Sequence, residues 1–165
     1  MKGYVPLWYI LTAALLISFI VLNLIGVENL PWYHSPHPDH VHQMDALRLL
    51  ADWTKWLVPV NAALSLASIY LEKSPPMNAE TKQILRCAGT SFIMSLIAAG
   101  ILLGAIAGAA EEIPRDPSVF TFKQFGLFQL ANLAFLEHAF FVLGLGFLVP
   151  LVWPKRGSSG ETPSG

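Results

Sequence analysis

The sequence predicts an all-α integral membrane protein built as a four-helix bundle. Hydrophobic residues make up 54% of the 165 residues and charged residues only 13%, with a mean hydropathy of +0.53, which is unusual for a soluble domain of this size. Four long apolar runs stand out, at residues 5–27, 47–71, 85–110 and 129–153. Each run can cross a hydrocarbon core of about 30 Å at about 1.5 Å per residue, and in lipid such runs satisfy their backbone hydrogen bonds as helices.

The first run, residues 5–27, is expected to be a membrane helix rather than a secretory signal. It is longer than the apolar core of a typical signal, only Lys2 precedes it, and no small-residue cleavage pattern follows it before Glu28.

The second helix cannot begin before about Pro38, because Pro36 and Pro38 hold the preceding chain extended. Its first part carries four charged residues of alternating sign on one helix face: Asp45, Arg48, Asp52 and Lys55. Lipid penalises charges unless they face protein or water, so we expect this charged stripe to turn inward, toward the other helices or a partner, and to form a polar vestibule under the histidine loop. The alternative is snorkelling toward the lipid headgroups beside Trp53 and Trp56.

The third helix is expected to be capped by Asn78. It contains "GILLGAIAG", in which Gly100, Gly104 and Gly108 form one ridge. Missing side chains there favour the close approach of another helix, either from this chain or from another subunit. The single cysteine, Cys87, excludes an internal disulfide and is expected to be a small buried apolar residue.

Before the fourth helix, "RDPSVF" has the form of a helix start, with Asp116 as cap and Pro117 in the first turn. It predicts a short interfacial helix ahead of the fourth span. Residues 1–153 therefore form a single transmembrane domain, and the small polar residues of 154–165 predict a disordered tail.

The lysines and arginines favour a cytoplasmic location for both termini, because cytoplasmic loops carry these residues in excess. One side of the predicted bundle collects Lys2, Lys73, Lys82, Arg86, Lys155 and Arg156. The other side has Arg48, Lys55, Arg115 and Lys123. We expect a bacterial or archaeal cytoplasmic membrane. Basic and acidic residues nearly cancel, at 10 and 11, and the absence of a basic patch excludes nucleic-acid binding.

The loop "HSPHPDHVHQMD" is a candidate metal site that faces the extracytoplasmic side in this orientation. Its imidazoles come from His34, His37, His40 and His42. Imidazole nitrogens suit copper or zinc, and Met44 would add a soft thioether. A solvated polar loop and a proton-sensitive contact with a partner subunit are the alternatives.

The fourth helix carries the most informative residues, Glu137 and His138, at roughly 14 Å from its start and near the bilayer centre. A carboxyl and an imidazole at that depth are costly and usually mark a functional site. Adjacent helical residues diverge by about 100°, so the two side chains cannot point the same way. The alternative is hydrogen-bonding glue between helices, with Asn61, Ser65 or Asn132 as partners.

Three mechanisms fit this pair. His138 can ligate haem or a chlorophyll-type pigment, His138 with Glu137 can hydrogen-bond and protonate a quinone, or Glu137 can couple protons in a transporter. We therefore expect an accessory or cofactor-holding subunit of a respiratory-type redox complex, more a non-catalytic subunit than an enzyme. It would contact lipid and either other membrane subunits or a second copy through the glycine ridge. A small transporter or a metal-handling membrane protein that uses the histidine loop is the competing class.

Overall fold

The structure is a computed structural model that describes residues 4–26, 40–74, 77–112, 123–124 and 128–153. These residues form four helices and one short antiparallel strand pair: α1 (Tyr4–Ile25), α2 (His40–Lys73), α3 (Ala79–Glu112), β1 (Lys123–Gln124), β2 (Phe128–Gln129) and α4 (Leu130–Val152). The four predicted apolar runs are thus confirmed as helices.

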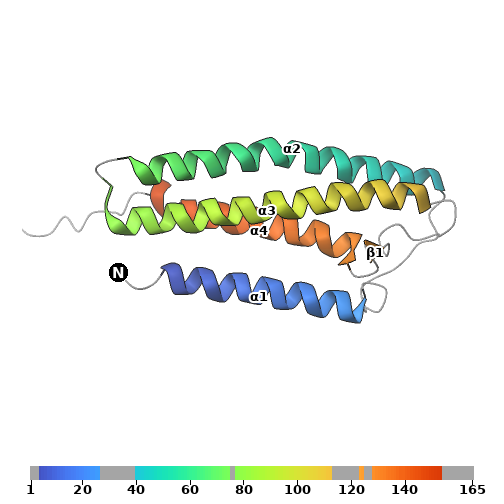
Figure 1. Ribbon diagram of the computed structural model, residues 1–165, viewed down its shortest axis with the longest axis horizontal. Helices are drawn as coiled ribbons and strands as arrows, with labels where there is room; N and C mark the ends of the chain where they lie inside the picture. Colours follow the sequence, from blue (N-terminus) through green and yellow to red (C-terminus); the bar gives the residue numbers. More distant parts are fainter. Residues whose placement is uncertain (1–3, 27–39, 75–76, 113–122, 125–127, 154–165) are drawn as a thin grey trace, which may run out of the picture.

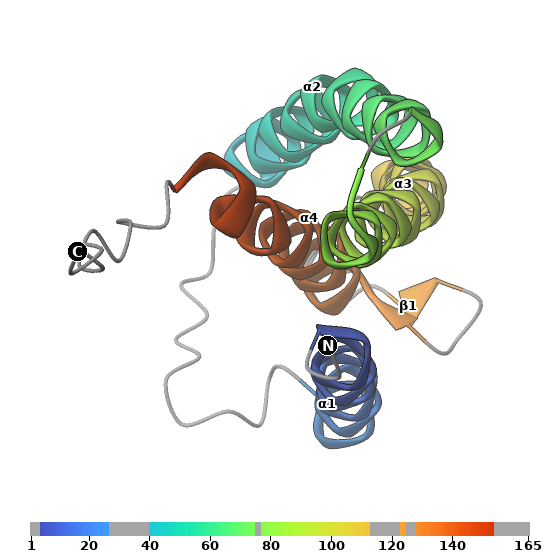
Figure 2. The same ribbon diagram turned by 90° about the vertical axis from the view of Figure 1, so that its left-hand side faces the viewer.

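The helices α2, α3 and α4 form an antiparallel bundle in which α3 packs against both of the others (Figure 1). The helix α1 lies beside this bundle along α3 and α4 (Figure 2). Two hydrogen bonds tie α1 down near its ends: Trp8 Nε1 donates to Ser91 Oγ at 2.9 Å, and the backbone N–H of Gln129 donates to Asn23 Oδ1 at 2.8 Å.

Among the described helices, α1, α3 and α4 are each long and apolar enough to cross a membrane, which indicates a membrane protein in contact with lipid. The helix α2 differs because charged residues occupy its first half. There Arg48 lies 3.6 Å from Asp45, and Lys55 lies 3.4 Å from Asp52.

The charged stripe does not turn toward the other helices of this chain, and a turn toward a partner stays a prediction. All four side chains are between 65% and 73% exposed. The opposite face of α2 packs into the bundle and buries mainly apolar and uncharged polar residues: Gln43, Leu47, Thr54, Leu57, Asn61, Ser65 and Ser68. Hydroxyl and amide groups cost less to bury than charges do, so α2 turns its neutral polar face inward.

The core divides into two clusters along α3. One joins α3 and α4 with a single residue each from α1 and α2, Phe19 and Leu47. The other contains Cys87, Phe92 and Phe147. The expectation that Cys87 is a small buried residue is confirmed.

Close approach between helices occurs at glycines outside the predicted ridge. A methyl group on Gly89 would lie 3.2 Å from Ser68 Cβ, and one on Gly144 would lie 2.6 Å from a ring carbon of Phe92. In contrast, such a methyl group on Gly100 or Gly104 would meet no atom of another described helix within 4 Å. The described helices therefore leave the ridge uncovered at these two glycines.

The described residues just before α4 are extended, and most of the predicted interfacial helix falls outside the described residues. Lys123 pairs with Gln129, and Gln124 pairs with Phe128, in an antiparallel strand pair. Phe128 also stacks on Phe19 of α1, with ring centroids 5.5 Å apart, so contact with α1 favours the extended form. Asp116 and Pro117 lie outside the described residues, as does the predicted tail 154–165.

The helix α3 begins as the sequence predicts. Its first residue follows Asn78, whose Oδ1 accepts a hydrogen bond from the backbone N–H of Thr81 at 2.7 Å. This is the geometry of a side-chain helix cap.

Candidate functional site

Glu137 occupies a core position of α4. Along α4, buried residues recur at alternating spacings of three and four: Leu130, Leu133, Glu137, Phe140, Gly144 and Phe147. Apolar residues at this spacing form the stripe by which a helix packs, and this stripe faces α3. Glu137 is carried inward with its neighbours, and none of its side chain is exposed.

The carboxyl group of Glu137 has few partners. Thr54 Oγ1, on α2, donates to Oε2 at 3.2 Å. The other oxygen, Oε1, is buried and has no hydrogen-bond partner among the described residues. The imidazole of His138 is the basic group beside this carboxyl in the described part of the chain, and its Nδ1 lies 3.9 Å from Oε2.

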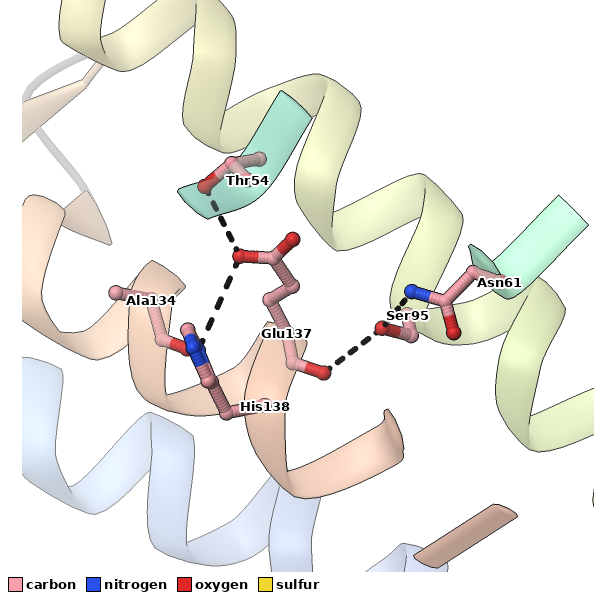
Figure 3. Close-up of polar contacts among 6 residues, drawn as sticks. All are labelled: Thr54, Asn61, Ser95, Ala134, Glu137 and His138. Carbon is pink, nitrogen blue, oxygen red and sulfur yellow. Dashed lines mark hydrogen bonds and ion pairs between the residues drawn. The ribbon is translucent and has the colours of Figure 1, made fainter. Parts of the chain in front are cut away.

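The backbone of Glu137 is held by a second polar contact. Ser95 Oγ, on α3, donates to the carbonyl oxygen of Glu137 at 2.8 Å and accepts from Asn61 Nδ2 of α2 at 3.0 Å (Figure 3). All three residues are fully buried. A polar layer thus crosses the three-helix bundle at this level and sets the position of α4 along α2 and α3.

His138 points to the side of the bundle rather than into it. Its Nδ1 lies 2.7 Å from the carbonyl oxygen of Ala134. Because a carbonyl only accepts, Nδ1 carries the hydrogen, and in the neutral ring the lone pair is on Nε2. The side chain is 38% exposed and stacks on Trp53 of α2, with ring centroids 6.0 Å apart and planes 7° apart. The prediction that the two adjacent side chains diverge is confirmed.

The hydrogen-bond partners that the sequence suggested for Glu137 and His138 were Asn61, Ser65 and Asn132, and none of them contacts either side chain directly among the described hydrogen bonds. Asn61 reaches Glu137 only through Ser95. Ser65 donates to the carbonyl oxygen of Asn61 in its own helix, and Asn132 donates to Gln129.

The sequence reasoning missed Thr54 and Ser95. Thr54 precedes Asn61 by seven residues, the spacing that keeps two residues on one face of a packed helix. That spacing is the signal by which Thr54 could have been found. Ser95 carries no comparable signal, because it lies among small apolar residues of α3.

The histidine loop lies largely outside the described residues. His34 and His37 fall in the segment 27–39, and His40 and His42 are in the first turn of α2 without described side chains. Within the described ranges, no group of three or more His, Cys, Asp or Glu side chains is placed to hold a metal ion. A metal site formed by the loop stays a prediction.

The arrangement places a fully buried acid next to a partly exposed base, with 3.9 Å between Oε2 and Nδ1. In the neutral ring Nε2 is the nitrogen that is left to accept. Such an imidazole can accept a hydrogen bond or coordinate a metal centre. No protein-family model, curated protein or solved structure matches this chain.

Proposed function

We propose that this chain is an accessory or cofactor-holding subunit of a respiratory-type redox complex in the membrane. In this proposal Glu137 and His138 form a proton-active site for haem, a pigment or a quinone. The chain positions the group and handles the proton, and it is not itself the catalytic subunit.

The unpartnered oxygen of Glu137 is the observation that carries the proposal. A residue kept only to join helices by hydrogen bonds gains nothing from a buried acceptor without a partner, because such an atom costs about 1–3 kcal/mol. Among the described residues Oε1 of Glu137 shares this condition with Asn61 Oδ1 and Thr12 Oγ1, but of these three atoms it alone belongs to a carboxyl group. Buried polar atoms of this kind are exceptions that call for another reason, such as a catalytic role.

The surroundings of Glu137 favour an uncharged carboxyl group. A carboxylate without a charged partner in the bundle interior would cost several kcal/mol. Nδ1 of His138 lies 3.9 Å from Oε2 and donates instead to the carbonyl oxygen of Ala134.

The imidazole of His138 is a suitable ligand or hydrogen-bond acceptor for a haem, a pigment or a quinone. The Nε2 lone pair can coordinate the metal of a haem or a pigment, and it can accept a hydrogen bond from the hydroxyl of a reduced quinone. When bound, such a group would supply the electron-transfer or light-absorbing chemistry. His138 would bind and orient it through Nε2, and Glu137, protonated beside the neutral ring, would be the nearby acid.

We further propose that α2 is the fourth span. At about 1.5 Å per residue its 34 residues are about 51 Å long, and it packs along α3, a helix of the same length. The charged first half would then lie at and beyond the outer interface. Both termini would face the cytoplasm of a bacterial or archaeal cell, as the distribution of basic residues favours.

The partners in this proposal are lipid and other membrane subunits or a second copy of the chain. Gly100 and Gly104 are exposed on α3 with open space above them. Another transmembrane helix can approach closely at such a surface.

The proposal is tested by isolating the native assembly from membranes through a tag on this chain. Its visible absorption spectrum and its content of extractable quinone are compared for the wild type, His138→Ala and the control Ser65→Ala. Ser65 is buried but bonds only within its own helix. We expect a haem or pigment band, or quinone enriched over the bulk lipid, in the wild type and the control, and its loss in His138→Ala. An assembly with none of these groups, or with equal contents in His138→Ala, contradicts the proposal.

A further inference from the structure

The lateral face that joins α2 to α4 has an aromatic surface above a buried acid. Trp53 is 54% exposed and His138 is 38% exposed, and their rings are nearly parallel. Directly beside them, Thr54 and Glu137 are fully buried and hydrogen-bonded to each other. A molecule that approaches this face meets the two rings and cannot touch the carboxyl group.

We propose that this face binds the headgroup of a lipid-soluble hydroquinone, whose phenolic O–H donates a hydrogen bond to Nε2 of His138 while its ring lies beside Trp53. This inference rests on the proposed function and names the ligand class of that site. Binding requires only the hydrogen bond and ring contact.

The tautomer of His138 favours a ligand that donates a hydrogen bond. Because Nδ1 donates to the carbonyl oxygen of Ala134 at 2.7 Å, the other nitrogen of the neutral ring, Nε2, is an acceptor. His138 stacks on Trp53, which lies between Asp52 and Lys55 in the part of α2 that the proposed orientation puts at the outer interface. A ligand of this site must partition into the lipid and still carry an O–H group. A hydroquinone with an apolar tail has both properties.

The carboxyl group lies next to the bound headgroup but takes no part in the hydrogen bond. With a neutral His138 that accepts at Nε2, the buried Glu137 is already protonated, and Nδ1 lies 3.9 Å from Oε2, beyond hydrogen-bond distance. Binding therefore moves no proton, and the phenolic O–H keeps its proton while donating a hydrogen bond to Nε2. Oxidation of the ligand would further require an electron acceptor in a partner subunit, a haem or an iron–sulfur centre.

The inference is tested on the full chain in lipid nanodiscs with a fluorescent hydroquinone analogue, heptyl hydroxyquinoline N-oxide, displaced by decylubiquinol. His138→Gln places an amide near the position of Nε2, whereas His138→Asn places one only near Nδ1. Trp53→Phe is compared with Trp56→Phe, since Trp56 is 76% exposed on the same helix. Far-ultraviolet circular dichroism checks that each variant keeps its helices.

We expect affinity to fall about tenfold or more in His138→Asn, the loss of about one good hydrogen bond, and to fall less in His138→Gln. Trp53→Phe should weaken binding and Trp56→Phe should leave it unchanged. Equal affinity in wild type and His138→Asn, or equal losses in the Asn and Gln variants, overturns the inference. If the analogue does not bind while the native assembly shows a His138-dependent haem or pigment band, only the ligand class is wrong. If neither is found, the proposed function fails as well.

Discussion

The hydrogen bond from Thr54 to Glu137 is expected to contribute measurably to stability, and Thr54→Val removes it with little change in shape. The two oxygens are 3.2 Å apart, and both side chains are fully buried. Oε1 already has no partner in the described part of the chain, and Nδ1 of His138 lies 3.9 Å from Oε2, which is beyond hydrogen-bond distance. Valine would therefore leave Oε2 without a donor, at a cost of about 1–3 kcal/mol.

The assay is unfolding by sodium dodecyl sulfate in mixed micelles, followed by circular dichroism, in a double-mutant cycle with Glu137→Met. In the methionine background the hydroxyl of Thr54 has lost its acceptor, so Thr54→Val should be neutral or stabilising there. The coupling free energy between the two positions should then be about 1–3 kcal/mol. Thr54→Ser is the control, since it keeps the hydroxyl and loses one methyl group, worth about 0.8 kcal/mol. An equal cost of Thr54→Val in both backgrounds would refute the reasoning.

Two further predictions concern helix packing. Gly144→Ala should lower the free energy of unfolding by about 1–3 kcal/mol, because its methyl group would lie 2.6–2.9 Å from three ring atoms of the fully buried Phe92. Gly146→Ala is the control, since its methyl group would meet no described atom within 4 Å, and it should cause no such loss. Equal unfolding curves for the two variants would contradict this packing. Ser91→Ala removes the acceptor of the 2.9 Å hydrogen bond from Trp8. Hydrogen–deuterium exchange of the backbone amides should therefore become faster in the first turns of α1 and stay unchanged in α4. Unchanged exchange in α1 would show that this hydrogen bond does not hold the helix against the bundle.

Stability and function are expected to separate at Glu137. Replacing a buried ionisable pair by apolar groups of similar size is often neutral or stabilising. Since one oxygen of this carboxyl has no partner among the described residues, Glu137→Met should leave the bundle at least as stable as the wild type while disrupting proton handling at His138. A marked loss of stability would instead favour a purely structural carboxyl.

The second helix shows where sequence reasoning reached its limit. Residues 45–68 carry two polar stripes, one charged and one made of hydroxyl and amide groups, on different faces of one helix. Helical periodicity finds both stripes, but it does not say which one meets a neighbour. The structure buries the neutral stripe, including Thr54 and Asn61, and exposes Asp52 and Lys55. The lower cost of burying uncharged polar groups accounts for that choice.

Local rules determined the helices, their apolar membrane-spanning character and the divergence of Glu137 from His138, because each depends only on residue type and on a repeat of 3.6 residues per turn. Only the tertiary structure decided that Thr54 and Ser95 are the groups that meet Glu137, and that Trp53 stacks on His138. These contacts join residues 42 to 85 positions apart in the chain, so they depend on how three helices pack along one another, and no short-range pattern encodes that register.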